Sequence, residues 1–317
     1  HFVVDLLRTR VRTPMNVVSF YRFTDVDDPA AVRGRLQVQC DKGALLGTIL
    51  VAEEGVNGTL AGEAQAIRDV LAWLEERLGL DEPIAGRWTE ATEAPFRRMR
   101  VRVKNEIVTL GRPDIRPDKL TGRHVGVEEW NRLISDPDTL VIDTRNGYEF
   151  EVGTFRNAVD PATDSFREFP EYAEKLAQSD PDRPLAMFCT GCIRCEKATA
   201  LMMELGFSEV YQLQGGILKY LEEVGDAENL WDGECFVFDT RVAVDRDRAE
   251  GDYVQCHACR RPLSSEDLAS PDYREGVSCP KCIGTHDTAR VERLEERRKQ
   301  VALAKERGES HIGAQLD

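Results

Sequence analysis

Residues 184–207 read PLAMFCTGCIRCEKATALMMELGF, which is an apolar run, a loop with three cysteines and a helical pattern in direct succession. The run 184–189 predicts a buried strand, and the apolar residues after the loop recur at helical spacing. Strand-like segments also occur on either side, at 139–145 (TLVIDTR) and 209–216 (EVYQLQGG). Strands that alternate with helices predict a doubly wound parallel sheet, in which ligands bind at the carboxyl ends of strands. The cysteine loop therefore lies where this fold places its site.

Cys189 closes the predicted strand, and a helix begins shortly after it. Free backbone N–H groups and the positive end of a helix both favour the thiolate, which is the nucleophilic form of cysteine. Arg194 adds a fixed positive charge. The loop from Cys189 to Arg194 is one residue shorter than the loop of protein phosphatases, and it suits a single sulfur atom rather than a phosphoryl group. The alternative is that Cys189 is a small buried apolar residue.

Two further cysteines, Cys192 and Cys195, follow at three-residue intervals. Either could be a resolving thiol that accepts sulfur from Cys189 or forms a disulfide with it, and otherwise both are packing residues. The spacing also resembles part of an iron–sulfur run, but Thr199 stands where a fourth cysteine is expected.

The first hundred residues predict a different fold. Residues 15–23 and 99–105 read as strands, and 29–43 and 63–79 as helices. Between the helices, LLGTILVAEEGVNGTLAG (45–62) predicts a hairpin with its turn at 53–58, because Asn-Gly between apolar runs favours a tight turn. This order of elements predicts a ferredoxin-like split βαβ domain.

Four cysteines near the end of the chain form two Cys-x2-Cys pairs, Cys256 with Cys259 and Cys279 with Cys282. Such pairs can direct four thiolates at one tetrahedral zinc ion. The surrounding segment has few apolar residues, so a structural zinc would replace part of a core. The alternative is four unrelated reduced cysteines.

The net charge of −15 argues against a nucleic-acid partner, but the charge is unevenly distributed. Residues 95–123 hold nine basic and three acidic residues, a net charge of +6. Such a segregated segment is a candidate track for phosphates, and the alternative is a solvated strand edge protected by charge. If the segment binds phosphates, the residues expected to contact them are Arg97, Arg98, Arg100, Arg102 and Lys104.

The cysteine count points to a reducing compartment. The chain has nine cysteines, an odd number that falls mostly in close groups, which is untypical of a secreted disulfide scaffold. We therefore expect a cytoplasmic protein. No run of 18 apolar residues is present, so no membrane partner is expected.

Several stretches together resemble the bacterial rhodanese-domain tRNA uridine hydroxylase family. They occur in order along the chain: EEGVNGTLAG, KNEIVTLG, LVIDTRNGYE, GTFRNAVDP, FREFPEY, FCTGCIRCEKA, QGGILKYLEE, WDGECFVFD and QCHACRRP…SCPKC. The resemblance implies a rhodanese-like domain with Cys189 as the active-site cysteine, thought to carry a persulfide, and with Asp143 and Arg145 in its strand-end motif. This chain departs from the family at Cys192, where glycine is usual.

The resemblance also implies the activity, which is the oxygen-dependent formation of 5-hydroxyuridine at the wobble position of tRNA. Cys189 would be the nucleophile, and Arg194 with the loop N–H groups would stabilise negative charge. Molecular oxygen would be the co-substrate, the anticodon loop of tRNA the partner and zinc a structural ion. No flavin or nicotinamide fingerprint is present. The alternatives are a sulfurtransferase that passes persulfide sulfur to an acceptor, and a non-catalytic interaction protein.

The expected organisation is a multidomain chain of α/β and α+β class. It consists of an extension (1–14), a ferredoxin-like domain (15–105), a basic linker (106–123), a rhodanese-like domain (124–226), and a zinc-ribbon-like region with a charged helix and tail (227–317).

Overall fold

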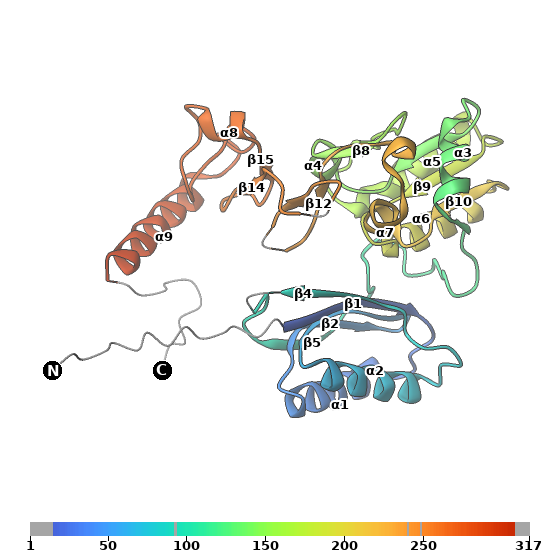
Figure 1. Ribbon diagram of the computed structural model, residues 1–317, viewed down its shortest axis with the longest axis horizontal. Coiled ribbons are helices and arrows are strands. Elements are labelled where there is room, and N and C mark those ends of the chain that lie inside the picture. Colours follow the sequence, from blue (N-terminus) through green and yellow to red (C-terminus); the bar gives the residue numbers. More distant parts are fainter. Residues whose placement is uncertain (1–14, 92–93, 240, 248, 308–317) are drawn as a thin grey trace. The chain divides into compact units, whose positions relative to one another are not determined.

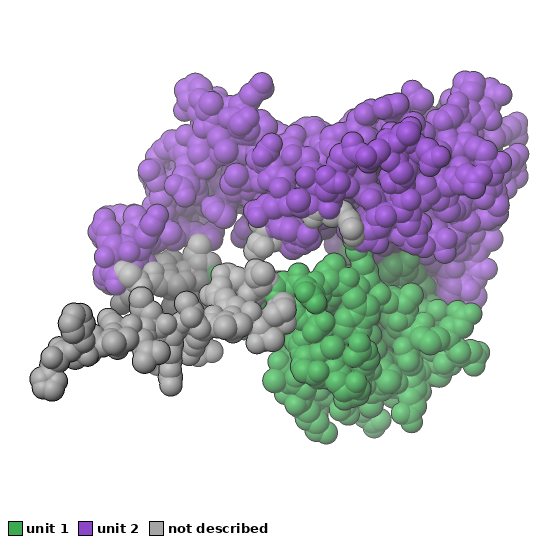
Figure 2. All heavy atoms as spheres, in the orientation of Figure 1, with its two compact units in different colours: residues 1–109 green, residues 110–317 purple. Residues whose placement is uncertain are grey.

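The structure is a computed structural model that describes residues 15–91, 94–239, 241–247 and 249–307. The expected extension (1–14) and the end of the expected tail lie outside the described residues. The chain forms two compact units, residues 1–109 and 110–317 (Figure 2). The first carries the ferredoxin-like fold, and the second carries the parallel sheet and the cysteine pairs.

The first unit is a five-stranded sheet with two helices on one face (Figure 1). The strand order is β4-β1-β3-β2-β5, with β1 antiparallel to both neighbours and β5 parallel to β2. The elements are β1 (Met15–Phe23), α1 (Pro29–Lys42), β2 (Leu46–Ala52), β3 (Gly55–Gly62), α2 (Ala64–Leu78), β4 (Gly86–Ala91) and β5 (Met99–Val103). The predicted ferredoxin-like class is confirmed.

The core of this unit forms because apolar residues alternate on the strands and repeat on the helices. Phe20 and Ile49 of the sheet pack against Leu36 of α1 and Leu74 of α2 in one buried cluster. The α1 helix starts as its sequence predicts, with the Asp28 side chain accepting the Ala31 N–H at 2.9 Å.

The predicted strand at 99–105 exists as β5, but it is not the fourth strand of the ferredoxin-like unit. That position belongs to β4, whose residues GRWTEA include no buried side chain and carry no strand pattern. β5 lies instead at the opposite edge of the sheet, beside β2. The side chains of α1 cover its outer edge: Val101 N–H donates to Gln37 Oε1 at 2.9 Å, and Arg33 Nε donates to the Val101 carbonyl at 3.1 Å.

The hairpin between β2 and β3 turns at Glu53 and Glu54, so the predicted placement of Asn57-Gly58 in the turn is wrong. Both residues lie inside β3, where Asn57 pairs with Leu50 and Gly58 with Ile49. A Cβ atom at Gly58 would come within 2.9 Å of Ile49 Cγ1. Glycine is therefore required here for close packing across the sheet rather than for a turn.

The second unit contains a four-stranded parallel sheet with strand order β6-β10-β9-β7. This confirms the predicted rhodanese-like α/β class. Its main elements are β6 (Arg123–Val125), α3 (Val127–Ser135), β7 (Leu140–Asp143), α4 (Gly147–Phe150), β8 (Gly153–Phe155), α5 (Phe169–Ser179), β9 (Leu185–Phe188), α6 (Ile193–Glu204), β10 (Val210–Leu213) and α7 (Gly216–Glu223).

An aromatic cluster supports the end of β9, directly before Cys189. The ring of Phe155 lies edge-to-face with Trp130, Phe188 and Tyr220, at centroid distances of 4.7 to 5.4 Å. Trp231 joins from β11 (Trp231–Gly233), which pairs with β8. Edge-to-face pairs add to the free energy of apolar burial, so the strand that carries the loop is firmly anchored.

The remaining chain is built from short elements and one long helix. These are β12 (Cys235–Phe236), β13 (Ala243–Val244), β14 (Val254–Gln255), β15 (Pro262–Leu263), α8 (Ser265–Ala269) and α9 (Thr288–Glu306). Among the described helices, none is both long and apolar enough to cross a membrane.

Candidate active site

Cys189 follows β9 directly and faces the start of α6. Its carbonyl accepts the Ile217 N–H at 3.0 Å, and the Thr190 carbonyl accepts the Leu218 N–H at 3.3 Å. These bonds require Gly216, which has a φ of +71°, because a Cβ there would lie 2.6 Å from both carbonyl oxygens. The Gly-Gly turn thus lets the start of α7 bind the carbonyl groups of the cysteine loop. The N–H groups of the cysteine loop then remain to face the thiol.

The pKa of the Cys189 thiol is held below its usual value. Burial alone would raise it, since Cys189 is only 1% exposed. Hydrogen bonding from the Cys195 thiol, the charge of Arg194, and the backbone N–H groups of Cys195 and Arg194 outweigh this effect. Cys189 is therefore the more acidic thiol of the pair and the better nucleophile.

Cys195 is the partner thiol of Cys189. Burial and the adjacent Cys189 thiolate raise its pKa well above the usual value, although Thr144 opposes the shift. The Oγ1 of Thr144 lies 3.5 Å from Cys195 Sγ and donates to the Phe188 carbonyl at 3.0 Å. Cys195 thus keeps its proton and directs it to Cys189.

Cys192 points in another direction. Its thiol lies 3.7 Å from Gln212 Oε1 and 3.5 Å from the Leu213 carbonyl, on the β10 side of the loop. Its backbone has a φ of +74°, the left-handed region that favours glycine. Of the two candidate resolving thiols, Cys195 is therefore the one hydrogen-bonded to Cys189.

Arg194 forms an ion pair with Glu149, a residue for which the sequence predicted no role. Its Nη1 and Nη2 donate to Oε2 and Oε1 of Glu149, at 2.7 and 2.8 Å. Glu149 is fully buried, and its Oε2 accepts the Asn146 N–H at 3.1 Å at the start of α4. The spacing Asn-x-x-Glu is a recognisable cap in the sequence, but nothing local links it to Arg194.

Asp143 and Arg145 lie close to the loop but pair with each other. The Arg145 Nη2 to Asp143 Oδ2 distance is 2.7 Å, and both side chains are fully buried. Arg145 also donates to the Gly153 carbonyl at 2.6 Å, and Thr154 donates to Asp143 at 3.1 Å. This pair fixes the ends of β7 and β8 rather than facing the reacting sulfur.

The four cysteines near the chain end come together as their spacing predicts. The sulfur atoms of Cys256, Cys259, Cys279 and Cys282 all lie within 4.8 Å of one another, and none forms a disulfide. The backbone N–H of Cys279 also lies 3.4 Å from Cys282 Sγ. Four thiols at this separation match the donor set and size of a tetrahedral zinc site, so the group could hold a metal such as zinc.

The basic segment divides into two kinds of residue. Arg112 pairs with Asp114 at 2.6 Å, and both Arg116 and Lys119 pair with Asp118. In the described part of the chain, by contrast, no hydrogen bond or ion pair involves the side chains of the basic residues on and beside β5, namely Arg97, Arg98, Arg100, Arg102 and Lys104.

Two of these residues, Arg100 and Arg102, share an orientation because they alternate along β5. Val101 and Met99 turn toward the helices and pack in the core, so Arg100 and Arg102 alternate onto the other face of the sheet. In the strand pairing, Arg100 stands beside Thr48 and Arg102 beside Leu50. Arg97, Arg98 and Lys104 lie exposed in the segments beside β5, and we refer to the five residues together as the basic surface.

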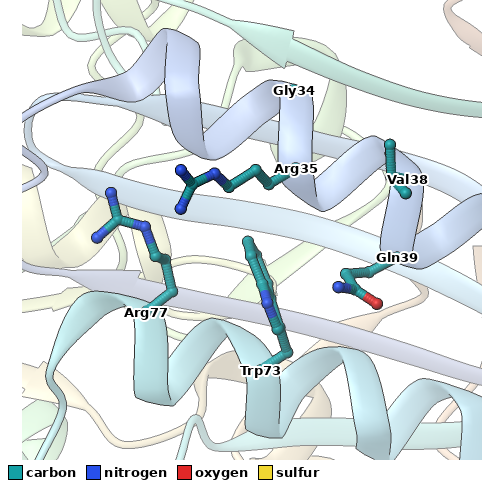
Figure 3. A pocket seen from close by; sticks show the side chains of 6 residues that line it. All are labelled: Gly34, Arg35, Val38, Gln39, Trp73 and Arg77. Carbon is teal, nitrogen blue, oxygen red and sulfur yellow. The ribbon is translucent and has the colours of Figure 1, made fainter.

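A hollow of about 280 Å³ between α1 and α2 contains no thiol or carboxylate (Figure 3). Trp73 and Arg77 of α2 face Arg35, Val38 and Gln39 of α1 across it. It lies in the first unit, whereas the cysteine loop belongs to the second.

The parallel sheet, the six-residue cysteine loop and the Gly-Gly turn that holds it define a rhodanese-type domain. Residues 126–223 match the rhodanese-like domain, and residues 15–107 match the UPF0176 acylphosphatase like domain. The chain therefore carries a UPF0176 acylphosphatase-like domain, then a rhodanese-like domain, and then a four-cysteine cluster. The rhodanese match supports an enzyme of the sulfurtransferase-like kind.

Solved structures show partial similarity to the chain. A rhodanese-like domain from Anabaena sp. is 16% identical and covers 36% of this chain and 80% of its own, with a TM-score of 0.29. A polysulfide-sulfur transferase from Wolinella succinogenes is 27% identical and covers 32% and 74%, with a TM-score of 0.27. An acylphosphatase from Coxiella burnetii is 18% identical and covers 28% and 92%, with a TM-score of 0.21.

Proposed function

We propose that the chain is a tRNA-modifying enzyme of the cytoplasm that converts the wobble uridine to 5-hydroxyuridine with molecular oxygen. The observation that carries this proposal is the low-pKa thiol of Cys189, held by backbone N–H groups and by a second thiol. The stretches that resemble the tRNA uridine hydroxylase family support tRNA as the substrate. The four-cysteine cluster serves as a structural zinc site in this proposal.

The chemistry begins with a nucleophilic sulfur. Addition of the Cys189 sulfur, as thiolate or persulfide, to carbon 6 of uracil makes carbon 5 electron-rich and reactive toward oxygen. The N–H groups of Arg194 and Cys195 would then stabilise the developing negative charge. Among the described residues, the buried hydroxyl of Thr190 has no hydrogen-bond partner, so it is available to the substrate.

The two paired thiols can supply the electrons. Uridine, one oxygen molecule and two thiols give 5-hydroxyuridine, one disulfide and one water, which balances atoms and charge. Cys189 and Cys195 are the pair in direct hydrogen-bonded contact, so they would become the disulfide. An external dithiol would then restore them by exchange.

The basic surface on β5 would hold the RNA backbone. Its five side chains have the charge that phosphates require, and no acidic neighbour is paired with them in the described residues. The uridine itself must be unstacked to reach a buried thiol, as bases in single-stranded RNA loops commonly are.

The deciding experiment replaces Cys189→Ser in cells that lack the chromosomal copy. Nucleoside mass spectrometry of their tRNA should show complete loss of 5-hydroxyuridine, while Cys40→Ala, a buried cysteine of the first unit, retains it. Unchanged modification in the Cys189→Ser strain would refute the proposal.

The second candidate is a sulfurtransferase, and the rhodanese-like loop favours it. The same N–H groups that hold a thiolate would hold a persulfide on Cys189. Purified protein that releases sulfite from thiosulfate in the presence of cyanide, with tRNA from deletion cells normal, would identify this activity instead.

A further inference from the structure

A second group of metal-binding side chains lies beside the cysteine loop, apart from the four-cysteine cluster. It consists of His124 on β6, Cys192 directly before α6 and Glu196 in the first turn of α6. One donor atom from each lies within 4.8 Å of the other two. The Nε2 of His124 is 3.0 Å from Oε1 of Glu196.

The donor set suits zinc. It combines an imidazole nitrogen, a sulfur and a carboxylate oxygen, all of which zinc accepts in protein sites. A thiolate and a carboxylate together balance the charge of a divalent ion. Cys192 is 3% exposed and Glu196 8%, whereas the side chain of His124 is 39% exposed. An ion can therefore enter on the His124 side, where water completes the coordination.

Neighbouring residues orient the carboxylate. Thr121 Oγ1 donates to Glu196 Oε2 at 2.9 Å, and Gln212 Nε2 donates to the same oxygen at 3.2 Å. These bonds hold Oε2 and direct Oε1 toward His124. Hydrogen bonds of this kind, from residues around the ligands, orient the ligands of metal sites.

The backbone at Cys192 is unusual for a residue with a side chain. A residue with a side chain at a φ of +74° bears backbone strain that glycine would avoid. The thiol lies 3.5 Å or more from the oxygens of Gln212 and Leu213, and a thiol is only a weak donor. A metal–thiolate bond would account for a cysteine at this strained position.

We propose that His124, Cys192 and Glu196 bind one Zn²⁺ ion. Binding replaces the proton of the Cys192 thiol with the metal and releases that proton to solvent, so no redox change occurs. The ion joins β6 to the start of α6 and occupies Cys192, which leaves Cys195 as the thiol that works with Cys189. The site does not depend on whether RNA is the substrate.

The test counts zinc in the full-length protein after loading with zinc sulfate and dialysis. Wild type should exceed both Cys192→Gly and His124→Ala by one equivalent per chain. Cys40→Ala should match wild type. All of these variants keep the four-cysteine cluster, so zinc bound there cancels when the zinc contents of variant and wild type are subtracted. The His124 side chain is 39% exposed, so its replacement should disturb the fold less than replacement of a fully buried residue.

A second measurement identifies the ligand. With Co²⁺ in place of zinc, the sulfur-to-cobalt charge-transfer absorbance of wild type should exceed that of Cys192→Gly by the amount expected for one thiolate ligand. Zinc should also slow iodoacetamide labelling of Cys192 at least tenfold. Equal zinc content in folded wild type and Cys192→Gly would overturn the proposal and leave a hydrogen-bonded cluster with a protonated thiol.

Discussion

Arg194 and Glu149 meet in a two-pronged ion pair, with N–O distances of 2.7 and 2.8 Å. The Glu149 side chain is fully buried, and that of Arg194 is 10% exposed. Arg194 also lowers the pKa of Cys189 through its charge. Glu149 therefore offsets part of the positive charge of Arg194 and limits how far that charge lowers the pKa of Cys189.

Glu149→Gln should lower the stability of the second unit and increase the acidity of Cys189 at the same time. Removing one charge of a buried pair costs about 3–5 kcal/mol. The unbalanced Arg194 would then stabilise the Cys189 thiolate more strongly. Urea unfolding measures the first effect, and the pH dependence of iodoacetamide labelling at Cys189 measures the second.

Glu151→Gln is the matched control, since Glu151 forms a more exposed pair with Lys281 at 2.7 Å. Its effect should stay below about 1 kcal/mol. An unchanged Cys189 labelling profile in folded Glu149→Gln would show that the two groups are not coupled.

The same pair predicts a dependence of stability on pH. Burial alone would raise the pKa of Glu149, but the charge and hydrogen bonds of Arg194 lower it below its usual value of 4.5. The pair therefore stabilises the fold above the pKa of the unfolded chain, and this contribution is lost as the pH falls through the folded pKa. Wild type should lose more stability than Glu149→Gln between neutral pH and pH values below 4.5, as measured by urea unfolding.

Cys195→Ala should raise the pKa of Cys189. The variant removes the thiol that donates to the Cys189 thiolate. A hydrogen bond to a charged group contributes about 1.5–3 kcal/mol, so the midpoint of Cys189 labelling should rise by roughly one pH unit or more. Cys192→Ala is the control and should shift it little. Identical profiles for Cys195→Ala and wild type would exclude Cys195 as the partner thiol.

Reversal of the basic surface should weaken RNA binding. The triple change Arg98→Glu, Arg100→Glu and Arg102→Glu should reduce tRNA affinity at least tenfold and flatten its dependence on salt, because fewer counterions are released. Fluorescence titration at several salt concentrations measures both.

The control for this experiment is Arg112→Glu with Arg116→Glu, since both arginines already pair with aspartates. It should have a smaller effect on affinity and on salt dependence. If the two multiple variants have the same tRNA affinity and the same salt dependence, the basic residues on and beside β5 are a solvated strand edge and not an RNA-binding surface.

Local patterns predicted much of the fold. The αβ alternation around Cys189 and the amphipathic α2 helix follow from periodicities of a few residues. β4 could not be found in this way, because its polar residues are held in place by backbone pairing with β1. The turn predicted at Asn57-Gly58 was wrong because the local pattern does not show the packing of Gly58 against Ile49, which is why glycine is needed there.

The site was predictable where its residues are close in sequence. Cys189 and Arg194 belong to one loop, and the Cys-x2-Cys pairs share one spacing. Glu149 and His124 come from other segments, 45 and 72 residues from their partners Arg194 and Glu196. Their roles depend on the tertiary fold that brings four strands together, and no short pattern in the sequence encodes such a pairing.

The two bonds from α1 to Val101 have a consequence for solubility. Edge strands with free backbone groups recruit strands of other molecules and promote aggregation. Gln37 and Arg33 occupy the N–H and the carbonyl of the central residue of β5, so that edge cannot extend the sheet into a neighbouring copy. Gln37→Ala with Arg33→Ala should therefore favour self-association, and the protein can display a basic strand without forming intermolecular sheets.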